Sequence, residues 1–338
     1  MGKTVLVTGG AGFIGTNLVA RLLATEGIDQ VRVLDDRSAG DHGTLADLTG
    51  EPTHPVGNLT DPVGNLTDPV GNLTDSRGSI LDPSALAEAT DGVDAIVHLA
   101  ARASVPESVA NPVDSHAVNV TGTVRVLEAA RQAGNAQVIV ASSAALYGAD
   151  PTLPTPETTP PDPRSPYAAT KLATEASTMA WSATYDLPVL PLRFFNVYGP
   201  YQPPGHVYAA AIPAFAAAVV EGTPVTVFGD GSQTRDFVYV DDVAWLITRA
   251  ITHGLTSPVP VNVAAGTRTS LLEIIDRLGQ AAGTTVATEF GPPRAGDVQR
   301  SQADISRLQA LVPSWSPTPL ADGLAATLDW MRVHLRGR

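Results

Sequence analysis

Short apolar runs alternate with longer segments of helical periodicity through the first two thirds of the chain. Runs rich in β-branched residues have the length of buried strands, at residues 4–8, 31–34, 95–99 and 138–140. Apolar positions three or four residues apart predict helices, at residues 12–23, 113–133 and 165–185. Strands that alternate with helices predict an α/β protein built on a parallel sheet.

The last third of the chain has a different pattern. From about residue 199 onward it is richer in proline, glycine and alanine, and its apolar segments are shorter. We therefore expect a smaller and more irregular second lobe there.

A short repeat interrupts the pattern between the second and third long strands. Residues 55–61, 62–68 and 69–75 each read Pro-Val-Gly-Asn-Leu-Thr-Asp, and residues 76–82 fit the same frame as a degenerate fourth copy. The period is too short for a solenoid, and it lacks the apolar stripe of a coiled coil. We expect residues 55–82 to form a loop insertion that arose by local duplication of a turn.

Composition and charge exclude several classes of function. The 338 residues are 43% hydrophobic, enough for about two domains. No cysteine is present, which excludes disulfides, iron–sulfur clusters, thiolate zinc sites and cysteine nucleophiles. A net charge of −13 argues against nucleic-acid binding. The histidines lack metal-ligand spacing, and no segment is typical of a signal peptide or a membrane span. We expect a cytoplasmic protein without a metal site.

The first motif with chemical meaning is a glycine-rich turn between the first strand and the first helix. Gly9, Gly12 and Gly15 permit a tight turn, close approach of a pyrophosphate to the backbone, and close helix–strand packing. Asp35 follows at the end of the next strand, where a carboxylate can accept the ribose hydroxyls. A carboxylate there repels a 2′-phosphate, so this pattern predicts NAD rather than NADP, although Arg37 is nearby.

A tyrosine and a lysine four residues apart form the second motif. Tyr167 and Lys171 share one face of a predicted helix. A phenol is a poor base at neutral pH unless a nearby cation stabilises its phenolate, and Lys171 supplies such a cation. Ser142 and Ser143 follow a predicted strand, where ligands of parallel α/β folds bind.

These motifs together resemble the extended short-chain dehydrogenase/reductases of the nucleotide-sugar epimerase/dehydratase family, and most closely the UDP-hexose 4-epimerases. The resemblance covers nearly the whole chain, with the repeats as the main departure. It implies a Rossmann-type doubly wound parallel sheet with a smaller C-terminal α/β substrate-binding lobe. The implied bounds are 1–198 and 235–264 for the NAD-binding domain and 199–234 and 265–338 for the UDP-sugar-binding lobe.

The resemblance also implies roles for individual residues. Ser143 and Tyr167 would flank the reacting hydroxyl of the sugar, and Lys171 would bind the nicotinamide ribose; these three are the expected catalytic residues. The expected NAD-binding residues are Gly9, Gly12, Phe13, Ile14, Gly15, Asp35, Ser79, Ile80, Leu99, Ala100, Ala101, Tyr167 and Lys171. The expected substrate-binding residues are Ser104, Ser142, Ser143, Asn196, Val227, Phe228, Arg235, Arg294, Asp297 and Ser301.

Two segments compete for one position of the family pattern. Family members often carry Gly-Asp-Ile after the third strand, with the aspartate at the adenine. Gly78-Ser79-Ile80 fits by its distance to the strand at 95–99, whereas Gly57-Asn58-Leu59 fits by its distance from Asp35. We favour Ser79.

The implied reaction is inversion at C4 of a UDP-hexose through a 4-keto intermediate, with tightly bound NAD that is recycled in each turnover. Dehydratases of the family need an extra acid and base after the serine, and this chain has Ala144 and Ala145 there. Ser301 replaces a bulky tyrosine of glucose-restricted members, which slightly favours UDP-glucose and UDP-N-acetylglucosamine as substrates. UDP-glucuronate remains open, as do a dehydratase and a non-catalytic NAD-sensing regulator. Helices 113–133 and 165–185 match those of the family's dimer interface, so we expect a homodimer.

Overall fold

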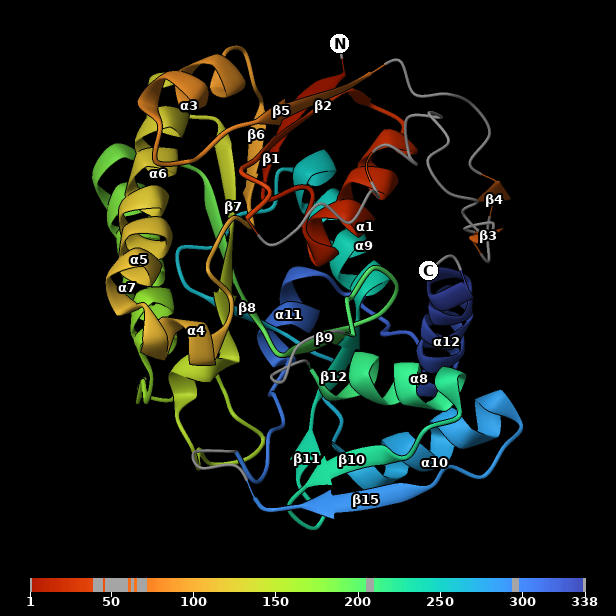
Figure 1. Ribbon diagram of the computed structural model, residues 1–338. Helices are drawn as coiled ribbons and strands as arrows, with labels where there is room; N and C mark the ends of the chain where they lie inside the picture. Colours follow the sequence, from red (N-terminus) through yellow and green to blue (C-terminus); the bar gives the residue numbers. More distant parts are fainter. Residues whose placement is uncertain are drawn as a thin grey trace. The chain divides into compact units, whose positions relative to one another are not determined.

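The computed structural model describes residues 2–38, 45, 60–61, 64–65, 72–204, 210–293 and 298–336. The chain divides into two compact units, and both contain segments from distant parts of the sequence (Figure 1). The first unit consists of Met1–Ser143, Ser165–Arg193 and Ala244–Val261. The second unit consists of Ala144–Arg164, Phe194–Val243 and Asn262–Arg338. The predicted assignment of NAD to one domain and the UDP-sugar to the other stays a prediction.

The first unit is built on the predicted parallel sheet. Its strands are β1 (Lys3–Thr8), β2 (Ile28–Asp35), β5 (Leu73–Arg77), β6 (Ala95–His98), β7 (Gln137–Ser143), β8 (Val189–Phe194) and β13 (Val261–Val263). Their order is β13-β8-β7-β6-β1-β2-β5, so the direction of winding reverses between β1 and β6. Thr8 is level with both Leu34 and His98 across the parallel ladders. Ligands of doubly wound sheets bind at the carboxyl ends of the strands beside such a reversal.

Helices cover both faces of this sheet (Figure 1). One face carries α1 (Phe13–Leu23) and the part of α9 (Val240–His253) that belongs to this unit. The other face carries α3 (Pro83–Thr90), α4 (Val105–Ala110), α5 (Pro112–His116), α6 (Gly122–Gln132) and α7 (Pro166–Tyr185). Leu6, Ile96 and Leu127 lie in the core between sheet and helices and are fully buried. Burial of each such side chain contributes about 1.5–3 kcal/mol. The α/β, doubly wound fold class is confirmed.

The predicted helix over 113–133 is not regular. It begins at Pro112 and ends near Gly134 as expected, but a turn of π-helix, η1 (Ala117–Thr121), separates α5 from α6. The side chain of Asn119 accepts a hydrogen bond from the Arg102 backbone N–H (2.7 Å) and donates to the Arg102 carbonyl (3.1 Å) and to Thr170 Oγ1 (2.9 Å). These contacts hold Asn119 against neighbouring segments, and the extra residue of the π turn accommodates them.

The repeat segment is not a loop throughout, which corrects our expectation for 55–82. The third copy ends in β5, and its residues Leu73, Thr74 and Asp75 pair with Val31, Arg32 and Val33 of β2. Thr60–Asp61 (β3) and Gly64–Asn65 (β4), from the first two copies, form a short antiparallel pair. The sequence pattern of the repeat hides the strand, because each copy has only two branched apolar residues and is otherwise typical of turns.

The position of β5 gives a prediction for the repeat. Deletion of residues 55–68 removes two copies and keeps the copy that forms β5. We expect the shortened protein to retain bound NAD at the level of the full chain and to unfold at a similar temperature. The NAD content after denaturation and the thermal midpoint measure this. Loss of NAD from a folded deletion protein would contradict it.

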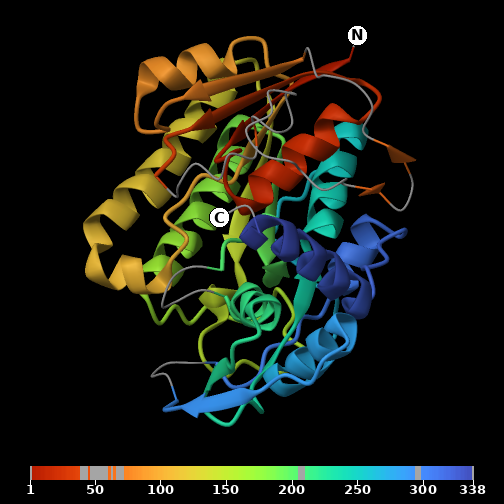
Figure 2. The ribbon, with the colours of Figure 1, turned by 45° about the vertical axis from the view of Figure 1, so that its right-hand side comes forward.

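The described residues of the second unit form mainly short strands and helices (Figure 2). Its strands are β9 (Asn196–Tyr198) paired with β12 (Phe237–Tyr239), β10 (Val225–Phe228) with β15 (Thr288–Gly291), and β11 (Thr234–Arg235) with β14 (Thr269–Ser270). Its helices are α8 (Ala211–Glu221), α10 (Leu271–Ala282), α11 (Ser306–Leu311) and α12 (Leu320–Arg336), with a 3₁₀ turn, η2, at Ala144–Tyr147. Tyr198, Phe215, Leu278 and Leu328 are buried in its core. In the described parts of the chain, no helix combines the length and apolar character needed to cross a membrane.

Candidate active site

The glycine turn after β1 is shaped by steric contacts with the backbone. Gly9 adopts φ = 74°, and a Cβ there would lie 2.6 Å from the backbone nitrogen of Ala100. A Cβ at Gly15 would lie 2.3 Å from the carbonyl oxygen of Gly9. Both positions therefore require glycine, since neither the backbone angle of Gly9 nor the space at Gly15 admits a side chain. The turn brings the start of α1 to the carboxyl end of β1.

Gly12 has a different environment from the other two glycines. A Cβ at this residue would approach only the Gly9 carbonyl oxygen, at 3.3 Å, so the remaining space beside it is open. Gly12 is also the N-cap of α1, with no side-chain cap and no acidic residue in the first turn. Backbone N–H groups and the positive end of the helix dipole are thus available there, with Phe13 and Ile14 in the first turn. This geometry fits the pyrophosphate of a dinucleotide.

Asp35 is held at the end of β2 beside the glycine turn. Its carboxylate accepts hydrogen bonds from the backbone N–H of Ala11 (3.0 Å) and of Arg37 (2.8 Å). The Arg37 guanidinium forms an ion pair with Asp75 of β5. A cation engaged in this way is less available for a 2′-phosphate, so the contacts of Asp35 and Arg37 fit the predicted NAD.

The loops after the neighbouring strands also reach this edge of the sheet. The backbone N–H of Gly78 donates to the Asp35 carbonyl (3.0 Å), which places Ser79 directly after β5 and next to Asp35. The alternative residue, Asn58, lies outside the described part of the chain. Ile80 does not face the edge: its side chain is only 4% exposed and packs in the core, where a Cβ at Gly122 would touch it. Ile80 would therefore meet NAD through its backbone rather than its side chain, and its role in NAD binding stays a prediction.

The loop after β6 contacts the glycine turn. Leu99, Ala100 and Ala101 are half-buried, and Ala100 is the residue against which Gly9 packs. Ser104 follows in the same loop and caps α4, because its Oγ accepts a hydrogen bond from the Glu107 N–H (3.2 Å). Its role in substrate binding stays a prediction.

Ser143, Tyr167 and Lys171 lie together in the first unit. Ser165 caps α7 by accepting from the Ala168 N–H (3.1 Å), which fixes where the helix begins. Tyr167 shares a side-chain hydrogen bond with Ser143 at the end of β7. The Lys171 ammonium donates to the Ala141 carbonyl (2.8 Å) and lies 5.9 Å from the centre of the Tyr167 ring. The structure thus brings the three predicted catalytic residues together.

Burial changes the protonation of this cluster. It raises the pKa of Tyr167, and the hydrogen bond with Ser143 opposes that rise. It lowers the pKa of Lys171 to about 8, and the charge of Glu175 opposes that fall. Lys171 is therefore still protonated at neutral pH, and its cation is available to favour the Tyr167 phenolate.

Ser142 differs from its neighbour. Side chains alternate along a strand, so Ser142 and Ser143 point to opposite faces of β7. Ser142 is buried, and its hydroxyl has no hydrogen-bond partner among the described residues. The family resemblance had already given the catalytic role to Ser143 alone, and the role of Ser142 in substrate binding stays a prediction.

Three of the predicted substrate residues gather in the second unit around residues 234–236. The Asn196 side chain donates to the Asp236 carbonyl (3.1 Å). Arg235 donates to the Thr234 carbonyl (2.9 Å), and the Ser301 N–H donates to the same carbonyl (3.1 Å).

Asp236 is a residue that sequence reasoning missed. Its buried carboxylate accepts from the N–H groups of Ala265 and Ala303, both at 3.0 Å, and burial raises its pKa to about 7. These hydrogen bonds connect the segments that contain Ala265 and Ala303 to the residue directly before β12. The available signal was a carboxylate directly before the apolar run Phe237-Val238-Tyr239.

The other predicted substrate residues are placed differently. The Val227 side chain is fully buried in the core of the second unit, whereas Phe228 is half-buried, and the roles of both residues in substrate binding stay predictions. Arg294 and Asp297 lie outside the described residues. Among the residues that the structure describes, no group of three or more histidine, aspartate or glutamate side chains could hold a metal ion.

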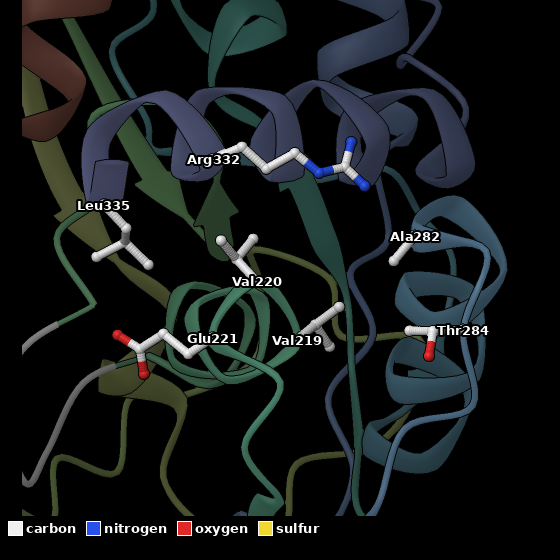
Figure 3. A pocket seen from close by; sticks show the side chains of 7 residues that line it. All are labelled: Val219, Val220, Glu221, Ala282, Thr284, Arg332 and Leu335. Atoms are coloured by element: carbon white, nitrogen blue, oxygen red, sulfur yellow. The ribbon is translucent and has the colours of Figure 1, made fainter. Parts of the chain in front are cut away.

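A separate groove of about 380 Å³ opens on the second unit (Figure 3). It is lined by Val219, Val220, Glu221, Ala282, Thr284, Arg332 and Leu335. Arg332 also pairs with Asp329 on the surface of α12 (2.7 Å). None of the predicted site residues lines this groove, so it is not part of the candidate active site.

A reversal in the winding of the sheet, a glycine turn at that edge, and a Ser-Tyr-Lys cluster define a dinucleotide-binding protein of the short-chain dehydrogenase/reductase type. The model of the NAD dependent epimerase/dehydratase family matches residues 5–264. The chain belongs to this family, and NAD is confirmed as its cofactor.

Individual relatives are similar over almost the whole chain. A UDP-glucose 4-epimerase of Mycolicibacterium smegmatis is 38% identical over 333 residues, covering 97% of this chain and 98% of the relative. The structure of a Thermus thermophilus UDP-glucose 4-epimerase in complex with NAD is 33% identical, with a TM-score of 0.81 and coverage of 97% and 99%.

The structure of a Methanobrevibacter ruminantium UDP-N-acetylglucosamine 4-epimerase, in complex with UDP-N-acetylmuramic acid, is 31% identical. Its TM-score is 0.85, and 97% of this chain and 98% of that chain are covered.

Relatives with other activities match as well. A UDP-glucuronate 4-epimerase of Thermodesulfobacterium geofontis is 34% identical and covers 73% of this chain and 75% of the relative. A dTDP-glucose 4,6-dehydratase of Streptomyces niveus is 30% identical and covers 97% of this chain and 92% of the relative.

Proposed function

We propose that this protein is an NAD-dependent UDP-sugar 4-epimerase, which inverts C4 of a UDP-hexose through a 4-keto intermediate. The observation that carries the proposal is the cluster of Ser143, Tyr167 and Lys171 beside a glycine turn that fits a dinucleotide. The alanines at 144 and 145 support epimerisation over dehydration, because elimination of water needs an additional acid and base.

Each residue of the cluster has a distinct task in this reaction. Tyr167, as the phenolate, takes the proton of the 4-hydroxyl and later returns it. Ser143 hydrogen-bonds to the same hydroxyl and to Tyr167, which orients both oxygens. Lys171 holds the phenolate by its charge and binds the nicotinamide ribose. NAD, when bound, supplies the exchange of hydride with C4 of the sugar.

Residues of the second unit are proposed to bind the nucleotide part of the substrate. Arg235 and Arg294 carry the cations that suit a diphosphate, and Asp297 would accept the hydroxyls of the uridine ribose. Asn196 would contact the sugar or its diphosphate, and Phe228 would line the uridine site. In a chain of net charge −13, affinity for an anionic substrate depends on such local cations.

Product analysis with three substrates tests the proposed function. The purified protein is incubated without added NAD, separately with UDP-glucose, UDP-N-acetylglucosamine and UDP-glucuronate. We expect at least one of them to equilibrate with its C4 epimer at unchanged mass. A product lighter by one water would instead indicate a dehydratase. No turnover together with freely exchanging NAD would favour the NAD-sensing regulator.

Ser301 gives a prediction for the choice of sugar. Its side chain is half-buried beside the Thr234 carbonyl, and a tyrosine there would reduce the room next to the sugar. We expect Ser301→Tyr to lower kcat/KM for UDP-N-acetylglucosamine by about tenfold or more relative to UDP-glucose. Equal losses for the two substrates would contradict the placement of Ser301 at the N-acetyl group.

We propose that two copies of the chain associate through α5, α6 and α7. Three valines on α4 and α5 are exposed in the single chain, Val105, Val109 and Val113, the last by 82%. Such a cluster supports an interaction surface. We expect analytical ultracentrifugation to give a dimer for the natural chain and a monomer for Val113→Arg. A natural chain that stays monomeric at high concentration would contradict this assignment.

A further inference from the structure

A buried ion pair joins α7 to β8, on the helix that carries Tyr167 and Lys171. The Arg193 guanidinium of β8 donates to both carboxylate oxygens of Glu175, with Nε 2.7 Å from Oε1 and an NH2 nitrogen 2.8 Å from Oε2. The side chains of Arg193 and Glu175 are 5% and 1% exposed. Removing two charges from water is costly, and well-packed apolar residues often replace such pairs without loss of stability. A contribution to stability therefore does not by itself account for this ion pair.

The positions along α7 connect this pair to the candidate active site. Tyr167, Lys171 and Glu175 follow one another at intervals of four residues and so lie along one side of the helix. Arg193 pairs with Glu175 and extends this row. From Tyr167 to Arg193, the charges that the groups carry when ionised alternate in sign. Lys171, Glu175 and Arg193 carry one net positive charge, which a Tyr167 phenolate would neutralise. A buried row of this kind favours the ionised phenol.

The other elements around Lys171 bring no competing charge among the described contacts. His98 of β6 is buried between Thr8 (2.8 Å) and Thr123 (3.0 Å), and its pKa is lowered to about 3 by burial and by Lys171, so it is neutral. On β7, the partner of Lys171 is a carbonyl oxygen.

The helices packed against this part of α7 likewise present neutral groups. Asn119 of η1 and Thr123 of α6 contact Thr170 and Thr174 of α7. Asp114 and His116 of α5 are exposed. Glu175 is thus the carboxylate that acts on Lys171 within the described surroundings.

We infer that Glu175, held in place by Arg193, is a positioning residue that keeps Lys171 protonated next to Tyr167. This inference rests on the roles proposed above for Tyr167 and Lys171. Burial alone pushes the Lys171 ammonium toward its neutral form, and Glu175 opposes this. Without Glu175, Lys171 would face Arg193 across a buried space and would lose its proton at lower pH.

Two pH titrations test this inference on the NAD-bound protein. The first is the pH profile of kcat/KM, whose decline at alkaline pH we expect to move down by about one pH unit in Glu175→Gln. The second is the ultraviolet absorbance of tyrosinate, which needs no turnover. Because the chain has 7 tyrosines, the signal of Tyr167 is obtained by subtracting the titration of the matching Tyr167→Phe protein. We expect Tyr167 to ionise at higher pH in Glu175→Gln. Loss of the Lys171 cation disfavours the phenolate, whereas loss of the Glu175 carboxylate favours it. The first effect is the larger, since Lys171 is one helical turn from Tyr167 and Glu175 is two turns away.

A second background shows whether Glu175 acts through Lys171. Arginine keeps its charge at any pH of the titration. We therefore compare Lys171→Arg with the double variant Lys171→Arg/Glu175→Gln. We expect Tyr167 to ionise at no higher pH in the double variant than in Lys171→Arg. An equal upward shift in both backgrounds would overturn the inference.

Controls separate this role from a contribution to folding. Thr178→Val removes a buried hydroxyl one turn further along α7 without changing a charge, and we expect it to alter thermal stability but neither titration. If Glu175→Gln does not fold, the double variant Glu175→Gln/Arg193→Gln keeps a neutral hydrogen-bonded pair and should give a smaller shift in the same direction. A folded variant of either kind with both titrations unchanged would overturn the inference. Absence of epimerase activity in the natural protein would contradict the proposed function and leave the tyrosinate titration to decide this inference.

Discussion

Replacement of Tyr167 by phenylalanine is expected to lower kcat by about 10²- to 10⁴-fold, because it removes the group that exchanges a proton with the 4-hydroxyl. The ring is half-buried and lies beside Lys171, so phenylalanine fits the same space. We expect the variant to fold and to retain NAD, as measured by the NAD content of the purified protein. Steady-state rates with the best UDP-sugar measure the loss.

Tyr185 provides a matched control for this prediction. It lies at the other end of the same helix and is 43% exposed, so Tyr185→Phe makes the same chemical change away from the cluster. We expect near-normal rates for this variant. Near-normal activity in Tyr167→Phe would count decisively against the proposed mechanism.

Replacement of Gly12 by valine is expected to weaken NAD binding by about 100-fold or more. The space next to Gly12 is open in the protein, so the chain can accommodate the new side chain. The valine would then occupy the place from which the pyrophosphate reaches the N–H groups of α1. The loss of a glycine N-cap adds a modest cost in stability of about 1 kcal/mol.

A graded series makes the Gly12 prediction specific. Gly12→Ser introduces a smaller side chain that can cap the helix, and it should weaken NAD binding less than Gly12→Val. Isothermal titration of NAD into the stripped proteins measures both, and thermal unfolding without NAD checks that each is folded. Equal NAD affinity for Gly12→Val and the natural chain would show that the dinucleotide does not bind at this turn.

Much of the fold could be predicted because its signals are local in the sequence. The glycine turn, its strand and its helix occupy one continuous segment, and the cap at Ser165 and the helix of Tyr167 and Lys171 occupy another. The periodicity of these segments specifies their type. Their order, strand after helix, implies the parallel sheet that the structure contains.

The errors come from features that depend on tertiary contacts. Strand β5 lies within a repeat whose sequence is typical of turns, and it forms because β2 offers an unpaired edge. The π turn at Asn119 exists because the side chain bonds to Arg102 and Thr170, both distant in sequence. Sequence spacing indicates neither contact.

The site shows the same division between local and distant information. Spacing along one helix was enough to group Tyr167 with Lys171, but the partner of Glu175 is on a strand 18 positions later. Ile80 and Val227 were included because they belong to family motifs, whereas their side chains face the cores of their own units. A motif identifies a segment, and the direction of each side chain depends on how that segment packs.

Transfer of deuterium at C4 tests the central proposal most directly. A UDP-hexose labelled with deuterium at C4 is equilibrated with the purified protein in ordinary water, and both epimers are examined by nuclear magnetic resonance. If the protein is a 4-epimerase that recycles its own NAD, the label stays at C4 of both epimers, and the mass is unchanged. Appearance of the label at C6 with loss of water, or its replacement by solvent hydrogen at C4, would contradict the account.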